Sequence, residues 1–353
     1  MKQIKKILMI CLLISGGSLM AQQIQLGEFK PKDTSFGLGK LKGKAKKVYI
    51  AAFNVNYQVY NEKQDFKQGG STLGGGFKGD ALAEISVGLD GLTNQDVQKI
   101  TDKLYADYVA QLKSKGLTIV TADEAAKTSV YADFEKLKGG EISLAQLPGT
   151  LSSAPSGYEY FVKKVDKSGK VKSGGFLGTT ATLYPKLSSE LDDAIIAEVN
   201  MYVLFIESAN AFKGNGANIK VQTNLRISGP EAIEMTSDNK VKFKGQNEYF
   251  MASSGVNFYH GKMGMGATTT YSGSLSKSLE INGVIEDTKL QSFANRSYGT
   301  ANQTVYGTFF TAQNKSAKNS KVVEVDGAKY YEGVYMAAKK FMDHHTQEFL
   351  KGF

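Results

Sequence analysis

Residues 48–60 read VYIAAFNVNYQVY, and this stretch decides the fold class of the chain. Its second half alternates between apolar and polar side chains, with Phe53, Val55, Tyr57 and Val59 on one side. A period of two residues is typical of a β-strand that buries one face. The stretch therefore predicts a strand within a sheet, and the segments around it indicate what pairs with that strand and covers it.

An amphipathic helix is predicted after a glycine-rich segment. Thr93 is a favourable N-cap with Asp96 three residues later, and Gly116 has the position of a C-terminal stop. Between them, apolar side chains recur at helical spacing at Val97, Ile100, Leu104, Tyr108 and Leu112. The short run LTIV at 117–120 follows directly. A strand entered straight from a helix predicts a crossover unit with two parallel strands.

The second half of the chain is rich in strand-like segments. Residues 195–208 and 218–228 are joined by Gly-Asn-Gly at 214–216, which predicts an antiparallel hairpin. Apolar residues at helical spacing over 330–350 predict a C-terminal helix. We also expect a second helix over 122–137 and a hairpin with arms at 158–165 and 170–176. The predicted fold is a mixed α/β sheet with a strand-helix-strand opening, a central antiparallel hairpin and a closing helix.

The first 21 residues have the pattern of a cleavable signal peptide. Lys2, Lys5 and Lys6 precede an apolar run from 7 to 14, and Ala21 supplies the small residue before cleavage. The run is shorter than the roughly 20 apolar residues that span a bilayer. We therefore expect an exported protein located in the periplasm or outer envelope, or outside the cell.

The mature chain is expected to begin at about Gln22. Residues 22–46 are polar and rich in glycine and lysine, which predicts a flexible basic lead-in. Residues 47–353 are then interpreted as one α/β domain with insertions at about 61–92 and 138–190. No segment of this mature region is apolar enough to predict a transmembrane helix.

Composition excludes several classes of function. The only cysteine, Cys11, lies inside the predicted signal peptide and is preceded by Ile10, so neither a lipid anchor nor a thiol site is expected. The net charge of +9 comes almost wholly from lysine, because Arg226 and Arg296 are the only arginines. Nucleic-acid readers depend on arginine forks, so the charge indicates solubility or attraction to anionic envelope surfaces instead.

The chain has three histidines, and none of them predicts a catalytic or metal site. His344 and Glu348 have i,i+4 helical spacing, with Asp343 adjacent, but a histidine near a helix C-terminus is usually explained by the helix dipole. His345 points to a different helix face from His344, and His260 lies between strand-like pieces, where a turn position explains it.

Glycine clusters and an acid pair also have ordinary explanations. Neither Gly70–Lys78 nor Gly174–Gly178 has the Gly-Lys-Ser/Thr ending of a phosphate-binding loop. Asp192 and Asp193 directly precede a predicted strand, where solvated acids are common. The sequence therefore predicts no catalytic, cofactor-binding or metal-binding residue, and no cofactor.

The order of elements resembles the periplasmic domain of the CsgG-like curli-secretion family and its relatives, the TolB amino-terminal domain and the LpoB activators. The segments that carry the resemblance are VYIAAF at 48–53, LKSKG at 112–116, TIV at 118–120, DEAA at 123–126 and DDAIIAEV at 192–199. The resemblance implies a protein that holds other envelope proteins and has no catalytic residues. The long insertions and the missing lipoprotein cysteine depart from that family.

These observations favour a non-enzymatic protein that acts in binding or assembly of envelope components. Its expected partner is an envelope protein or an anionic polysaccharide, with a homo-oligomer as a further possibility and no nucleic acid. Two alternatives stay open. One is a secreted carbohydrate-acting hydrolase with an unrecognised pair of carboxylates, and the other is an oligomeric outer-membrane pore.

Overall fold

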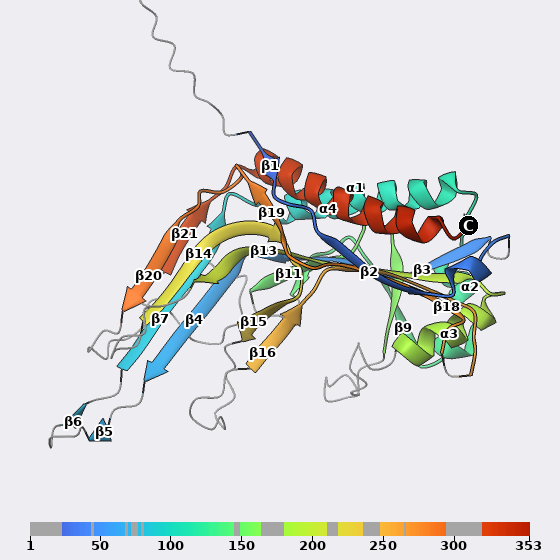
Figure 1. Ribbon diagram of the computed structural model, residues 1–353, viewed down its shortest axis with the longest axis horizontal. Helices are drawn as coiled ribbons and strands as arrows, with labels where there is room; N and C mark the ends of the chain where they lie inside the picture. The colour runs from blue at the N-terminus through green and yellow to red at the C-terminus, as the bar shows by residue number, and fades with distance from the viewer. Residues whose placement is uncertain are drawn as a thin grey trace, which may run out of the picture.

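The computed structural model describes residues 23–43, 46–67, 70–71, 77–78, 81–144, 149–163, 180–209, 218–235, 248–264, 266–293 and 320–353. The predicted signal peptide at 1–21 lies outside these residues. So do the whole of the expected second arm at 170–176 and the turn at 214–216. Within the described residues the chain forms an α/β fold, as predicted, with one large mixed sheet and several smaller sheets (Figure 1).

Two long strands form the centre of the large sheet. β3 (Lys47–Gln58) pairs in parallel with β13 (Ile195–Ala209), from Val48 opposite Ile195 to Tyr57 opposite Val203. β8 (Thr118–Ile119) also lies parallel to β3, and α1 (Asn94–Ser114) belongs to the connection between them and directly precedes β8. The strand-helix-strand opening predicted from the sequence is therefore confirmed.

The other strands of the large sheet are antiparallel. β13 pairs with β14 (Asn218–Ile227), which confirms the predicted hairpin, and with β17 (Gly255–His260). β17 continues to β18 (Thr269–Leu275), and β14 pairs with both β19 (Leu279–Asn282) and β20 (Lys289–Phe293). At the other side of β3 lie β11 (Thr150–Ser153) and then β10 (Ser143–Leu144).

Two helices cover one face of this sheet. α1 begins at a capping box in which Thr93 and Asp96 satisfy each other's backbone N–H groups. α4 (Gly327–Leu350) lies beside α1 along the same face (Figure 1), which confirms the closing helix. Their apolar sides meet the inward side chains of the central strands in one core, where Phe258 and Phe349 stack with ring centroids 3.9 Å apart.

A smaller group of elements covers one end of the opposite face. α3 (Thr180–Glu190) and the antiparallel pair of β9 (Phe134–Lys138) and β12 (Glu159–Lys163) lie there (Figure 1). They form a second core with Tyr49 and Ile196, in which Tyr131 and Phe161 stack at 4.1 Å. The prediction of a helix over 122–137 is wrong: α2 (Ala122–Ala125) and the 3-10 helix η2 (Ser129–Tyr131) are short, and 134–138 is β9.

Within the insertion expected at 61–92, most of the described residues form strands. β4 (Tyr60–Lys67) pairs with β7 (Ala81–Asp90), and β7 pairs in parallel with β21 (Ser320–Glu324). A separate two-residue pair joins β5 (Gly70–Ser71) to β6 (Phe77–Lys78). The three-stranded sheet lies against β14 and β20, and a further hairpin of β15 (Glu231–Met235) and β16 (Glu248–Ala252) projects nearby (Figure 1).

The predicted flexible lead-in at 22–46 is corrected by the structure. β1 (Gln25–Leu26) pairs with β19, and β2 (Pro31–Phe36) pairs with β18 at the opposite edge of the sheet. Between them, Phe29 packs edge-on against His344 of α4 at 5.3 Å, with Lys340 Nζ 5.1 Å from its ring centre. A 3-10 helix, η1 (Leu38–Lys40), follows. Residues 23–36 thus form a strap across α4, held at both ends by strand pairing.

Among the described helices, none has both the length and the apolar character that crossing a membrane requires.

Candidate functional site

The three histidines considered as candidate site residues lie on two elements. His344 and His345 lie on α4, and His260 ends β17. His345 is buried, and its imidazole contacts the Tyr271 hydroxyl at 2.8 Å and the Ser274 carbonyl oxygen at 2.9 Å. Because a carbonyl only accepts, His345 Nε2 donates to Ser274 and Nδ1 accepts from Tyr271. Burial lowers the pKa of His345 to about 4, so this ring is a neutral part of the core.

The acids near these histidines are engaged by lysines. Asp343 forms an ion pair with Lys339 at 2.8 Å, and Glu348 forms one with Lys351 at 2.6 Å. In the described part of the chain, no group of three histidine, cysteine or acidic side chains is placed to hold a metal ion. The i,i+4 spacing of His344 and Glu348 therefore places them as neighbours on one side of α4.

Asp192 and Asp193 form the turn that leads into β13. Both have left-handed backbone conformations, with φ of 53° and 54°. Aspartate adopts this region more readily than most residues because its short side chain can bond locally. Asp192 also pairs with Lys47 at 2.9 Å on the exposed surface. The acid pair is explained by turn geometry. The glycine segment at 70–78 contributes β5 and β6, and 174–178 lies outside the described residues.

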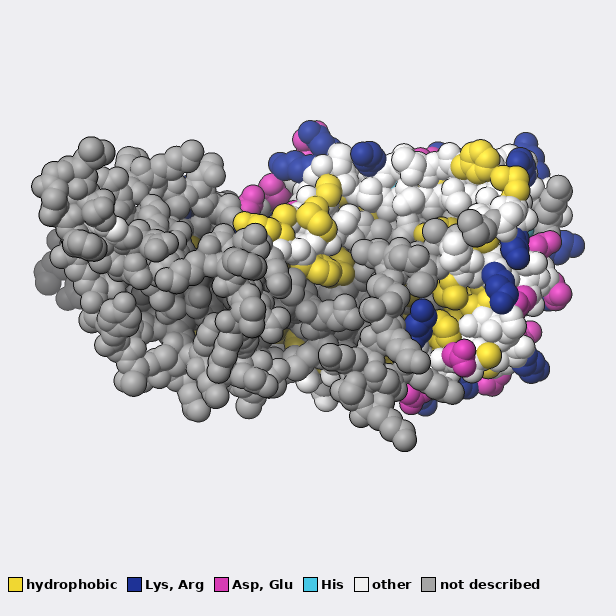
Figure 2. Space-filling model, turned by 90° about the horizontal axis from the view of Figure 1, so that it is seen from below, with side chains coloured by type: hydrophobic (Ala, Val, Ile, Leu, Met, Phe, Trp, Pro, Cys, Tyr) yellow, Lys and Arg dark blue, Asp and Glu magenta, His cyan; other side chains and the backbone are white. Residues whose placement is uncertain are grey.

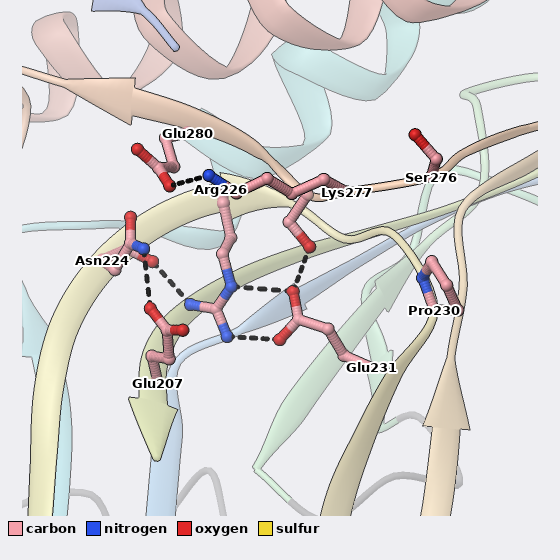
Figure 3. A pocket seen from close by; sticks show the side chains of 9 residues that line it. Glu207, Asn224, Arg226, Pro230, Glu231, Ser276, Lys277 and Glu280 are labelled. Carbon is pink, nitrogen blue, oxygen red and sulfur yellow. Dashed lines mark hydrogen bonds and ion pairs between the residues drawn. The ribbon is translucent and has the colours of Figure 1, made fainter. Parts of the chain in front are cut away.

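A small polar pocket of about 280 Å³ lies where β14, β15 and the turn before β19 meet (Figure 3). Its centre is Arg226, whose guanidinium is almost fully buried. Nε and Nη2 donate to the two Glu231 carboxylate oxygens at 2.9 and 2.6 Å. Nη1 donates to the Asn224 carbonyl, and Nη2 also donates to that of Ile206. We call the residues Glu207, Asn224, Arg226, Pro230, Glu231, Ser276, Lys277, Ser278 and Glu280 the Arg226 pocket.

The chemistry of the Arg226 pocket is largely internal. Ser278 Oγ donates to Glu231 and accepts from the Gly229 amide at 2.8 Å. Burial tends to raise the pKa of Glu231, but the Arg226 guanidinium and the Ser278 hydroxyl lower it by more, so its pKa is below the ordinary value. The Arg226 guanidinium points at the Glu231 carboxylate (Figure 3). The pair therefore connects the start of β15 to β14, and the guanidinium is not oriented toward a ligand.

A second group of polar side chains lies on the large sheet, on the face away from α1 and α4. Successive residues of a strand point to opposite faces, and Val199 and Met201 of β13 belong to the core under those helices. Glu198, Asn200 and Tyr202 therefore point the other way. Neighbouring strands contribute at matching positions. We call this group the Asn face; it consists of Asn54, Asn56, Glu198, Asn200, Tyr202 and Asn257.

A bulge in β3 brings the strands into this arrangement. The β3–β13 register shifts between Ala197 and Glu198, so that Ile50 is opposite Ala197 while Ala52 is opposite Glu198. The extra residue is Ala51. It reverses the alternation of β3, so that Asn54 and Asn56 share a face with Asn200.

Hydrogen bonds connect the side chains of the Asn face. Asn56 Nδ2 donates to Asn200 Oδ1 at 2.8 Å, and Asn200 Nδ2 donates to the Tyr202 hydroxyl at 3.3 Å. Asn257 accepts from the Ser272 hydroxyl at 2.7 Å and donates to Glu198. The side chains are thus held in fixed orientations on rigid strands.

Glu198 is the unusual member of this group. Only 6% of the residue is exposed, and no ion pair to it is formed by the part of the chain described here. Burial raises the pKa of Glu198 to about 7, an effect that the Asn257 hydrogen bond only partly offsets. A buried carboxyl without a cation is costly to the fold, and such groups are concentrated at functional sites. The Asn face is therefore the best candidate site.

The chain matches no protein-family model, no curated protein and no solved structure.

Sequence reasoning missed both groups. Glu198 interrupts the apolar run IIAEVNMYVLFI at 195–206, and an acid inside such a run indicates a buried carboxyl. That signal was present. Arg226 lies between Leu225 and Ile227, which is the pattern of a solvent-facing residue on a strand. Its ion pair with Glu231 arises only because the chain turns back into β15.

Proposed function

We propose that this is an exported, non-enzymatic protein of the periplasm or outer envelope that binds or assembles other envelope components. One observation supports this most directly: large apolar side chains are exposed on edge strands. Tyr249 and Met251 of β16 are 62% and 58% exposed, and Phe36 of β2 and Val322 of β21 are also exposed. Among the described strands, each of these three pairs with a single neighbour.

β16 is the clearest of these edges. Its two faces differ, because Phe250 points to the body of the protein, where its ring centre lies 5.7 Å from that of Tyr202, while Tyr249 and Met251 point away. Figure 2 shows the molecule from below, with hydrophobic side chains exposed on that side. An edge strand with exposed apolar side chains favours pairing with a strand of another protein. Pairing of this kind would join two proteins by main-chain hydrogen bonds, as assembly requires.

The predicted signal peptide and the resemblance to the CsgG-like group support the envelope as the place of action. Export is tested by expressing the full chain and measuring the mass of the protein in each cell fraction. We expect a processed chain beginning at about Gln22 outside the inner membrane. An unprocessed chain in the cytoplasm would contradict the proposal.

The binding function is tested by using the mature chain as bait in an envelope extract. We expect one envelope protein to be recovered in stoichiometric amount. Replacing Met251 by Ser together with Tyr249 by Ser should reduce its recovery several-fold. Met263→Ser is the matched control, because Met263 is 57% exposed but lies in a turn. Equal recovery with all variants, or recovery of glycan alone, would contradict a β16 interface.

The second candidate is a carbohydrate-acting hydrolase. The raised pKa of Glu198 favours it, because a carboxyl that holds its proton near neutral pH can act as a general acid. A second carboxylate about 5–10 Å away would be required. Release of reducing ends from an envelope polysaccharide, lost in Glu198→Gln, would establish this candidate.

A further inference from the structure

We infer that the Asn face binds a neutral sugar ring, such as one unit of an envelope polysaccharide; the inference rests on the proposed binding function and names its ligand class. A sugar ring presents neighbouring hydroxyl groups that each donate and accept a hydrogen bond. Recognition therefore requires fixed side chains that offer both roles, with an apolar surface beside them.

The strand register places such side chains in three rows. Glu198 lies opposite Ala52 on one side and Asn257 on the other, and Asn200 lies between Asn54 and Gly255. Tyr202 and Asn56 form the third row. Adjacent strands are about 4.8 Å apart and alternate residues of one strand about 6.7 Å apart. These spacings are close to the size of a sugar ring, so one ring can contact two rows at once.

The groups in these rows match the needs of hydroxyl recognition. Each asparagine amide offers two donors and an acceptor. Asn56 is buried and uses its amide nitrogen on Asn200 and on the Met201 carbonyl oxygen. The half-buried Asn54, Asn200 and Asn257 are the amides with capacity left by the described hydrogen bonds. Gly255 adds no side chain to the middle row. Specific sites place a few polar groups of this kind on a preformed surface.

Aromatic side chains border the polar rows. Tyr202 and Tyr259 are half-buried, and the Tyr259 ring is held by Tyr184 of α3 with ring centres 5.2 Å apart. Partly exposed tyrosine rings provide rigid apolar surface and a polar tip. The C–H face of a sugar ring fits against such a surface while its hydroxyls reach the amides.

Charge favours a neutral ligand over an anionic one. The Asn face has one ionisable carboxyl, Glu198, and no ion pair to it is formed by the described residues. A uronate or phosphate placed here would face that carboxyl with no compensating cation from the described residues, which is repulsive in a desolvated setting. The anionic polysaccharide expected from the net charge of the chain would therefore have to bind elsewhere.

The test is calorimetric titration of the mature chain with chitotriose, maltotriose and laminaritriose as neutral probes and tri-galacturonate as the anionic probe. We expect saturable binding of at least one neutral probe. Glu198→Gln and Asn257→Ala should each weaken it about tenfold, the effect of losing about 1.4 kcal/mol of hydrogen bonding. Glu207→Gln is the matched control, since Glu207 lies on the same strand but is exposed, and it should bind as the wild type does.

A second test uses a surface substitution, so that the result does not depend on whether the variants at Glu198 and Asn257 fold. Ser272 is exposed beside Asn257, so Ser272→Trp should cover the face while leaving Glu198 in place. It should abolish binding with an unchanged circular dichroism spectrum. No neutral probe bound at millimolar concentration, tighter binding of tri-galacturonate, or binding unaffected by Ser272→Trp would each overturn the inference. Recovery of a protein partner in the bait experiment would leave the proposed function standing in those cases.

Discussion

Gly273 of β18 faces the imidazole of His345 so closely that a Cβ at position 273 would lie 2.3 Å from His345 Cγ. The ring occupies the volume that a side chain at 273 would need. This contact fixes α4 on the sheet beside the Tyr271 and Ser274 hydrogen bonds. The absence of a side chain at Gly273 therefore lets α4 pack directly on β18, between β17 and β2.

Gly273→Ala should destabilise the protein by about 3 kcal/mol or more, because neither the ring nor the strand can move without losing a hydrogen bond. Denaturant unfolding followed by circular dichroism measures the change. Gly39→Ala is the matched control: nothing lies within 4 Å of its added Cβ, so we expect less than about 0.5 kcal/mol there. Similar effects at both positions would contradict the packing described for Gly273.

Stability should fall as the pH is lowered from 6.5 to about 4 because of His345. Burial holds the pKa of this histidine at about 4 in the folded chain, below its ordinary 6.5, so the unfolded chain takes up the proton first. The neutral ring contributes up to about 3 kcal/mol above pH 6.5, and this is lost as the pH falls through 4. His345→Gln should flatten the free energy of unfolding over this range. An unchanged slope would contradict the assignment.

Glu198 should have the opposite pH dependence. Burial raises its pKa from 4.5 to about 7, so the folded chain binds the proton more tightly than the unfolded chain does. Its favourable contribution is complete below pH 4.5 and is lost as the pH rises through 7. Glu198→Gln should therefore raise stability at pH 8 by about 2–3 kcal/mol, with little change at pH 4. Glu207→Gln should show no such difference between the two pH values.

The Arg226–Glu231 pair should be essential to the region around β15. Arg226→Ala leaves the Glu231 carboxylate without its cation, and breaking a buried pair costs about 3–5 kcal/mol. Lys277→Ala removes the exposed pair with Glu280 at 3.3 Å and should cost less than about 1 kcal/mol. Thermal unfolding distinguishes the two. Equal, small effects would show that the Arg226 guanidinium is not a structural clamp.

The sequence predicted the elements whose hydrogen bonds and core contacts are local or strongly periodic. β3, α1, the β13–β14 hairpin and α4 belong to this class. β9 was predicted as helix because Val130, Phe134 and Leu137 have helical spacing, whereas its backbone partner is β12, more than twenty residues later. α3 has no helical signal in the sequence because proline usually interrupts a helix, whereas Pro185 lies inside α3. When a strand pairs with a segment distant in sequence, the residues of the strand itself do not indicate that pairing.

The candidate site was less predictable than the fold. Asn54 and Asn200 each read as the outward residue of an alternating strand. Only the bulge after Ile50 and the parallel register bring them together, and neither is visible in the order of residues. The acid at 198 could have been identified from its apolar neighbours, but not the amides around it.

The strap formed by residues 23–36 has a consequence for how the chain folds. Its backbone partners come late: Gln25 pairs with Asn282, and Thr34 pairs with Ser272. If the chain is exported amino-terminus first, the strap is among the first segments to leave the channel and among the last to find its partners. Contacts this distant in sequence slow folding. In that order of emergence, the strap would stay unpaired until β18 and β19 had also left the channel.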